Sequence, residues 1–212
     1  MMYEDRVIQL CSNYAAIAHQ GQFRKDGKTP YISHPGRVAS SAATIGKLDF
    51  MGVCSSWLHD TPEDCAVGKH GDKNYPFIIK NHTDRYKDIR LFLLDNPDIN
   101  KSDGQKILQL TMELCMSQDK SISKNKRKKQ YIKDIANGSL DAAIIKYCDR
   151  LDNLTTCHIF SQGGMKYYIE DTQMILDKLG PKVKMVNSLI HLELERKLKE
   201  VTKTYLRMYD KK

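Results

Sequence analysis

The chain has 212 residues, of which 34 are Lys or Arg and 26 are Asp or Glu, so its formal net charge is +8. Apolar residues make up 41% and charged residues 28%, a balance that fits a globular protein and argues against an intrinsically disordered chain. No apolar run approaches the roughly 20 residues that span a bilayer, and we recognise no secretory signal. We therefore expect one compact domain over residues 1–212, located in the cytoplasm and without a membrane partner.

The hydrophobic pattern is helical nearly throughout, with apolar residues at three- and four-residue steps and no useful strand-like alternation. The pattern predicts helices over about 7–18, 36–45, 48–60, 105–117, 124–137, 139–160, 165–179 and 182–209. Gly180-Pro181 is expected to separate the last two helices, because Pro disfavours a helix interior. Residues 65–104 look irregular, apart from a short apolar piece near 86–94. The predicted fold is an all-α, single-domain helical bundle of nine or ten helices.

Four ionisable side chains lie at the end of the stretch at 48–60 and directly after it, in the sequence His59-Asp60-Thr61-Pro62-Glu63-Asp64. Charged groups beside a buried helix are costly unless they pair or bind a metal ion. An adjacent His and Asp can give one ion a nitrogen and an oxygen ligand, whereas an isolated pair of this kind is most simply a charged helix end. His34 upstream and Asp149 downstream favour the metal site, and this mixed set suits Mn²⁺ or Fe²⁺ better than a structural zinc ion.

Four separated motifs occur in the order Gly21-Gln-Phe-Arg-Lys-Asp-Gly27, Tyr31-Ile-Ser-His-Pro35, Leu58-His-Asp-Thr-Pro-Glu-Asp64 and Lys146-Tyr-Cys-Asp-Arg-Leu-Asp-Asn-Leu154. In this order they resemble the HD hydrolase domain of the Rel/Spo alarmone family, and most closely its small, hydrolase-only members. The resemblance implies a guanosine-3′,5′-bis(diphosphate) 3′-pyrophosphohydrolase that converts (p)ppGpp into GDP or GTP and pyrophosphate.

The resemblance also implies a role for each matching residue. The metal ligands would be His34, His59, Asp60 and Asp149, holding one Mn²⁺ per active site; the catalytic residues that position and activate water would be Glu63 and Asp64; and the substrate-binding residues would be Arg24, Lys25, Tyr31, Asn153 and Thr156. Arg150 is expected instead to stabilise the fold by pairing with a carboxylate.

The interval between Asp64 and Asp149 looks longer than in compact family members, which predicts an insertion at about 66–105. The insertion could be a lid, an oligomer contact or a surface loop, so homo-oligomer formation stays open. It also leaves the substrate open. The alternative is an HD phosphatase acting on another phosphorylated nucleotide, such as NADPH or ppApp.

The excess positive charge is concentrated in the basic run at residues 120–129. Such a run is usually a solvated helix face, and the competing interpretation is a rim that attracts phosphate groups. Net charge alone would also suggest a nucleic-acid-binding protein. We recognise no nucleic-acid-binding motif, so we expect a small nucleotide as the partner and no specific nucleic acid. A nucleotide-binding protein with a degenerate site is disfavoured, because all the proposed ligands and both acidic residues are present.

Overall fold

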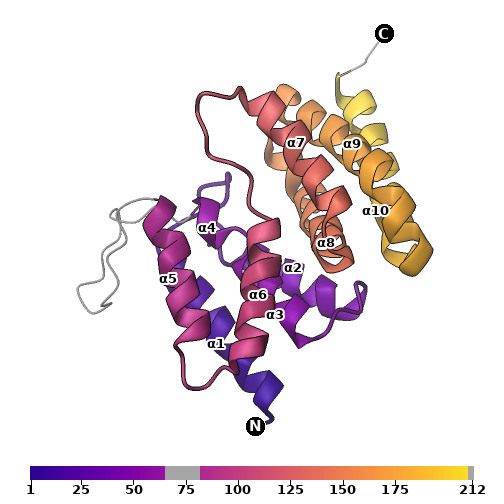
Figure 1. Cartoon of the computed structure of the whole chain (residues 1–212). Helices are drawn as coiled ribbons and strands as arrows, with labels where there is room; N and C mark the ends of the chain where they lie inside the picture. Colours follow the sequence, from indigo (N-terminus) through magenta and orange to yellow (C-terminus); the bar gives the residue numbers. More distant parts are fainter. Residues whose placement is uncertain (65–81, 210–212) are drawn as a thin grey trace.

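The structure, a computed structural model, describes residues 1–64 and 82–209, and within these ranges it is all α-helical (Figure 1). The helices are α1 (Tyr3–Ala18), α2 (Ser33–Thr44), α3 (Phe50–Leu58), α4 (Thr61–Asp64), α5 (His82–Leu94), α6 (Lys101–Glu113), α7 (Lys124–Asn137), α8 (Leu140–Thr156), the 3-10 turn η1 (Cys157–Ile159), α9 (Gln162–Val186) and α10 (Ser188–Tyr209). The predicted fold class is confirmed. No helix in the described ranges is both long and apolar enough to cross a membrane.

Two hydrophobic cores organise the bundle, one in each half of the molecule in Figure 1. The N-terminal core joins α1, α3, α5 and α6 through residues such as Val7, Leu58 and Ile89. The C-terminal core surrounds α8, whose Ile145 and Tyr147 are fully buried among residues of α2, α7, α9 and α10. Helices α2, α3 and α8 meet where the two halves join, and the site described below lies there.

Side-chain caps fix the starts of two of these three helices. The carboxylate of Asp49 accepts a hydrogen bond from the backbone N–H of Gly52 at 3.0 Å, which begins α3. The hydroxyl of Ser139 accepts from the N–H of Ala142 at 3.1 Å, which begins α8. Such caps satisfy backbone donors that a helix start leaves without partners, and each is worth about 1 kcal/mol.

The prediction that Gly180-Pro181 separates two helices is wrong. Helix α9 runs through both residues to Val186, although an internal Pro costs about 3 kcal/mol. Burial on either side offsets that cost, since Leu179 and Val183 are fully buried. Gly180 serves packing instead: a Cβ there would lie 3.1 Å from Cε1 of His191 on α10, so its small size lets α9 and α10 approach closely.

The break between α9 and α10 falls at Asn187. Its Oδ1 accepts a hydrogen bond from the N–H of Ile190 at 3.2 Å, and its Nδ2 donates to the carbonyls of Ile45 and Gly46 at 2.9 Å each. Asn187 therefore starts α10 and ties it to the end of α2. This long-range anchor explains why the helix boundary lies six residues beyond Pro181.

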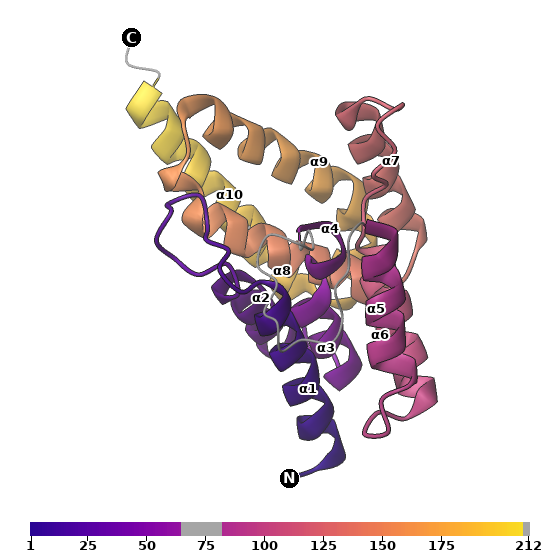
Figure 2. The ribbon, with the colours of Figure 1, turned by 90° about the vertical axis from the view of Figure 1, so that its left-hand side faces the viewer.

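The irregular stretch expected at 65–104 is only partly described, because residues 65–81 lie outside the described ranges. The described remainder is largely helical. It holds α5 and the start of α6, which run side by side in Figures 1 and 2. Ile89 and Leu93 of α5 are fully buried. The insertion expected at 66–105 stays a prediction, and the described residues of that range contribute Ile89 and Leu93 to the N-terminal core.

Candidate metal centre and adjoining cavity

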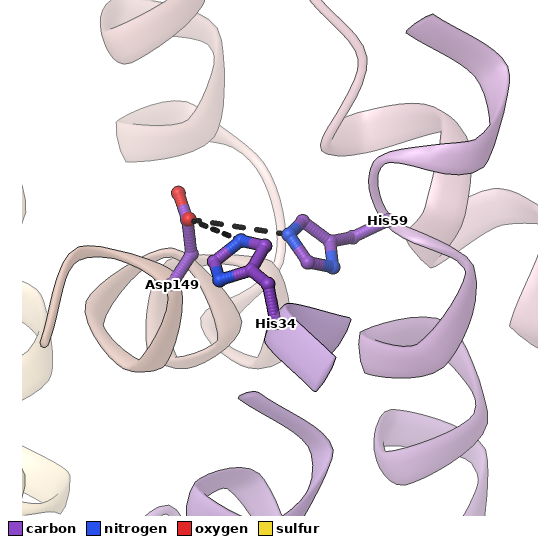
Figure 3. Close-up of side chains that lie close together, drawn as sticks. All are labelled: His34, His59 and Asp149. Atoms are coloured by element: carbon purple, nitrogen blue, oxygen red, sulfur yellow. Dashed lines mark ion pairs between the residues drawn. The ribbon is translucent and has the colours of Figure 1, made fainter. Parts of the chain in front are cut away.

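Three buried side chains, two from helices and one that directly follows a helix, converge where the two halves of the bundle join (Figure 3). His34 stands in the first turn of α2, His59 directly follows α3, and Asp149 lies in the middle of α8. Each offers one nitrogen or oxygen atom, and these atoms all lie within 4.8 Å of one another. Nε2 of His34 is 3.3 Å from Oδ1 of Asp149, and Nε2 of His59 is 4.0 Å from the same oxygen. We refer to this cluster as the candidate metal centre.

Asp60, the fourth predicted ligand, borders the same centre. Its Oδ2 lies 3.3 Å from Nε2 of His34, and its Oδ1 lies 3.2 Å from Nε2 of His59. The hydroxyl of Tyr31 donates to Oδ2 at 2.9 Å. The structure thus brings together all four side chains that the sequence suggested as ligands, although Asp60 is outside the three-atom cluster.

The two histidines present the same nitrogen to the centre because their other nitrogens are engaged. Nδ1 of His34 lies 2.6 Å from Oδ2 of Asp152, and Nδ1 of His59 lies 2.7 Å from the carbonyl oxygen of Ser56. Within the described part of the chain, the buried Nε2 of His59 has no hydrogen-bond partner. Two imidazole nitrogens beside carboxylate oxygens form a donor set that fits a divalent cation. A buried imidazole nitrogen without a hydrogen bond is expected where that nitrogen binds a metal ion.

The electrostatics of the centre favour ionised carboxylates. Burial alone would raise the pKa of Asp149, but Lys146 and the hydrogen bond with His34 hold that pKa well below its usual range. Burial likewise opposes ionisation of Asp60, and the two histidines lower its pKa nonetheless. For His34, burial disfavours the charged ring, while contacts with Asp149, Asp152 and Asp60 raise the pKa of the imidazole. The centre therefore concentrates negative charge that a cation can offset.

A cavity of about 430 Å³ opens beside the candidate metal centre. Its wall combines cationic and aromatic side chains, which are Arg24, Lys25, Lys124, Lys128, Lys146, Arg150, Phe23, Tyr31, Tyr131, Phe160, Tyr167 and Tyr168. Cations suit phosphate groups, and aromatic faces suit a base or a sugar. The volume and composition of the cavity fit a small phosphorylated molecule better than a polymer.

Four of the five predicted substrate-binding residues line this cavity. Arg24 donates from Nη2 to Oδ1 of Asn153 at 3.0 Å, and its guanidinium lies 5.4 Å from the ring centroid of Tyr31. Nζ of Lys25 lies 4.5 Å from the ring centroid of Phe160. Thr156 is not part of the cavity wall: its hydroxyl bonds back to carbonyls of its own helix, with an O···O distance of 3.3 Å to Asp152.

Of the two predicted catalytic acids, Glu63 and Asp64, only the side chain of Glu63 lies in the described part of the structure. Glu63 lines the cavity from α4, and its Oε1 accepts a hydrogen bond from the backbone N–H of Met116. The backbone of Asp64 ends α4, but its side chain lies outside the part of the structure that is described, so its predicted role stays a prediction.

Sequence reasoning did not single out two charged groups that act on the centre. Nζ of Lys146 donates to Oδ2 of Asp149 at 2.7 Å. Asp152 contacts His34 and pairs with Arg37, whose Nε lies 2.5 Å from Oδ1. Both stand three residues from Asp149 on α8, so helical spacing from this candidate ligand was the signal that could have found them.

The prediction that Arg150 pairs with a carboxylate is confirmed, since its Nη2 lies 2.6 Å from Oδ2 of Asp171 on α9. Lys128 of α7 pairs with the same carboxylate. Of the basic run at 120–129, Lys124 and Lys128 line the cavity and are four residues apart on one face of α7. The remaining cations of the run do not line it, so two residues, rather than the whole run, form a basic rim.

The chain is similar to known proteins in sequence and in fold. No protein-family model matches the chain. It is 29% identical over 203 residues to the guanosine-3′,5′-bis(diphosphate) 3′-pyrophosphohydrolase MESH1 of Drosophila melanogaster, with 94% of each protein covered. It is 30% identical over 156 residues to MESH1 of Xenopus tropicalis, with 73% of this chain and 71% of that protein covered.

A bacterial guanosine-3′,5′-bis(diphosphate) 3′-pyrophosphohydrolase, from Aquifex aeolicus, is 28% identical over 178 residues, which cover 83% of this chain and 21% of that protein. A solved structure described as a metazoan ortholog of SpoT that hydrolyzes ppGpp has a TM-score of 0.69 at 23% identity, covering 92% of this chain and 94% of the other. This structural likeness shows the shared fold. Given the identity and coverage of its MESH1 relatives, the chain belongs to the guanosine-3′,5′-bis(diphosphate) 3′-pyrophosphohydrolase family that includes MESH1.

Proposed function

We propose that this protein hydrolyses the 3′-pyrophosphate of (p)ppGpp, releasing GDP or GTP and pyrophosphate, with one Mn²⁺ ion per active site. The main support for the proposal is that two imidazoles and two carboxylates converge in the lining of one cavity, whose other lining residues include many cationic and aromatic side chains. The names of the relatives supply the substrate. Residues 1–212 would act as a single hydrolase domain.

His34, His59, Asp60 and Asp149 would hold the cation through imidazole nitrogens and carboxylate oxygens. When bound, a divalent cation supplies Lewis acidity: it offsets charge on phosphate oxygens and lowers the pKa of a coordinated water towards neutrality. A site of two nitrogen and two oxygen ligands without thiolate suits Mn²⁺.

Glu63 would accept a proton from the attacking water. Its carboxylate lines the cavity beside the candidate metal centre, and the hydrogen bond from the N–H of Met116 holds its Oε1 in place. General-base assistance of this kind typically contributes about 10²–10⁴-fold to the rate. The water oxygen would form a bond to the phosphorus atom that is attached to the ribose 3′ oxygen. The bond between that phosphorus and the 3′ oxygen would break, and the 3′ oxygen would take up a proton to become a hydroxyl group.

The cavity wall would bind the two ends of the nucleotide. Arg24 and Lys25 already lie against aromatic rings, Tyr31 and Phe160, so their flat or apolar surfaces are positioned for a base and their charges for phosphate. Lys124 and Lys128 would attract the remaining phosphate charge from the rim. Asn153, fixed between Arg24 and Asp149, would contact the sugar beside the centre.

A substrate panel tests the proposal: purified protein with Mn²⁺ is incubated with ppGpp, ppApp and NADPH, and the products are identified. Release of pyrophosphate and GDP from ppGpp at the highest kcat/KM supports the proposal. Preferential turnover of ppApp or NADPH would keep the metal chemistry but move the assignment to the alternative HD phosphatase. Turnover of none of the three, by folded protein with metal bound, would contradict it.

A further inference from the structure

We infer that Asp152 and Arg37 form a positioning pair that fixes the ring orientation and tautomer of His34, and thereby sets the affinity of the centre for its divalent cation. The inference rests on the metal centre of the proposed function, but neither residue is among the ligands or the cavity wall assigned above. It concerns how the protein orients the His34 side chain, a proposed metal ligand, before a cation binds.

The contact between Asp152 and His34 determines which ring nitrogen carries hydrogen. Oδ2 of Asp152 lies 2.6 Å from Nδ1 of His34. An ionised carboxylate can only accept, so Nδ1 must donate and the lone pair of the neutral ring is on Nε2. Nε2 is the atom that faces the centre, 3.3 Å from oxygens of both Asp60 and Asp149.

Arg37 holds the Asp152 carboxylate in that orientation. Nε of Arg37 lies 2.5 Å from Oδ1, and Nη2 lies 3.2 Å from Oδ2, so two nitrogens of one planar group engage both oxygens. The Asp152 side chain is 6% exposed, whereas that of Arg37 is 44% exposed. The guanidinium thus neutralises a carboxylate that would be costly to bury without a partner, and fixes its plane.

The register of two helices builds this arrangement. His34 and Arg37 are three residues apart on α2, and Asp149 and Asp152 are three residues apart on α8. Residues three apart share a helix face. Each helix therefore supplies one proposed ligand and one supporting residue on the surface that faces the other helix. His34 of α2 contacts both aspartates of α8, and Arg37 of α2 contacts Asp152.

The two histidines differ in the support they receive. His59 is oriented by the carbonyl of Ser56, a neutral acceptor three residues earlier in the same chain segment. His34 is oriented by a charged acceptor from another helix. A carboxylate partner raises the basicity of a metal-binding imidazole, and removal of such a partner typically costs about 10–100-fold in metal affinity. Of the two histidines, His34 is therefore the one whose affinity for a cation depends on another side chain, that of Asp152, which a substitution can remove.

The test measures Mn²⁺ affinity directly, from the electron paramagnetic resonance signal of free Mn²⁺ during titration of the protein. The variants are Asp152→Asn, Arg37→Gln and Arg37→Lys. The control is Glu113→Gln, which makes the same carboxylate-to-amide change at a residue that contacts Ser139 and lies outside the cavity wall. We expect Asp152→Asn to weaken Mn²⁺ binding about 10–100-fold, Arg37→Gln to weaken it less, and Arg37→Lys to recover part of that loss. Glu113→Gln should change the stability of the fold but leave the Mn²⁺ affinity of the folded protein unaltered.

Folded Asp152→Asn protein with unaltered Mn²⁺ affinity would overturn the inference. Should that variant fail to fold, the half-exposed Arg37 decides instead, and unaltered affinity in Arg37→Gln would overturn it. Pyrophosphate release from ppGpp is followed in the same samples to separate the two proposals. Unaltered protein that binds Mn²⁺ without hydrolysing the nucleotide contradicts the proposed function alone, and protein that binds no divalent cation contradicts both.

Discussion

Nε2 of His59 lies 3.2 Å from Oδ1 of Asp60, the next residue in the chain, and both side chains point to the centre that His34 completes. The pair follows the apolar helix α3 directly, so the packing of that helix places both groups. This relationship makes Asp60 the proposed ligand whose loss should be most informative, because its carboxylate contacts both histidines and accepts a hydrogen bond from Tyr31.

Asp60→Ala is expected to abolish metal retention and turnover while leaving the helical fold intact. The substitution removes an oxygen donor and leaves two imidazoles close to Asp149 without it. Metal content of the purified variant and pyrophosphate release are the measurements. Asp5→Ala, at an exposed position of α1, is the control that should retain both. Full activity of the Asp60 variant would remove Asp60 from the ligand set.

Glu63→Gln is expected to slow hydrolysis by about 10²–10⁴-fold with Mn²⁺ affinity nearly unchanged. The amide keeps the size of the side chain and can still accept from the N–H of Met116, but it cannot take a proton from water. The values of kcat and the Mn²⁺ dissociation constant are compared for the two proteins. A variant that loses Mn²⁺ instead would show that Glu63 is a ligand.

Lys124→Ala is expected to raise KM for ppGpp about two- to five-fold, the effect of one partly exposed charge, with a smaller change in kcat. Lys124 lies on the rim of the cavity, where solvent screens it, so raising the ionic strength should reduce the difference from the unaltered protein. Lys129→Ala is the matched control, since Lys129 belongs to the same basic run but is absent from the cavity wall. Equal KM values for the two variants would argue against the rim.

Gly104→Ala is expected to destabilise the fold by about 1–3 kcal/mol, the usual cost of overpacking. A Cβ at Gly104 would lie 2.1 Å from the carbonyl oxygen of Leu93, so α6 would have to move away from α5. Gly163→Ala is the control, because a Cβ there meets nothing within 4 Å. Thermal unfolding of both variants measures the effect, and equal melting temperatures would contradict the packing of α5 on α6.

The stabilising contribution of Glu113 is expected to depend on pH. Burial alone would raise its pKa, but hydrogen bonds from Ser139 and Gln109 hold the pKa of this carboxylate below its usual value. A lowered pKa in the folded protein gives stability above the pKa of the unfolded chain, about 4.3, and this stability is lost as the pH falls through the folded value. Glu113→Gln should therefore be less stable than the unaltered protein near pH 7, with the difference shrinking towards pH 3. A pH-independent difference would contradict the assignment.

Local signals in the sequence were enough for most of the helices and for the four ligand candidates. The apolar spacing of α1 and the cluster at His59-Asp60 are readable because the cause lies within a few residues. The break at Asn187 was not readable, since it depends on carbonyls of Ile45 and Gly46 that only the folded chain brings near.

Long-range contacts also explain what was missed at the site. Asp152 gains its role from His34 and Arg37, which belong to another helix, so the sequence offers only its three-residue spacing from Asp149 as a sign of that role. Thr156 was assigned to the substrate through the resemblance, but its hydroxyl turns back to its own helix. In both cases the contacts of a side chain depend on its direction in the folded protein, which the residue type does not reveal.

The most direct measurement is pyrophosphate release from ppGpp by the purified protein in Mn²⁺, then after chelation, then after Mn²⁺ is restored. The proposed site predicts turnover that chelation stops and added Mn²⁺ recovers, with one pyrophosphate formed per GDP. Pyrophosphate release that continues unchanged in chelator, from protein shown to be metal-free, would contradict the central role of the His34, His59, Asp60 and Asp149 centre.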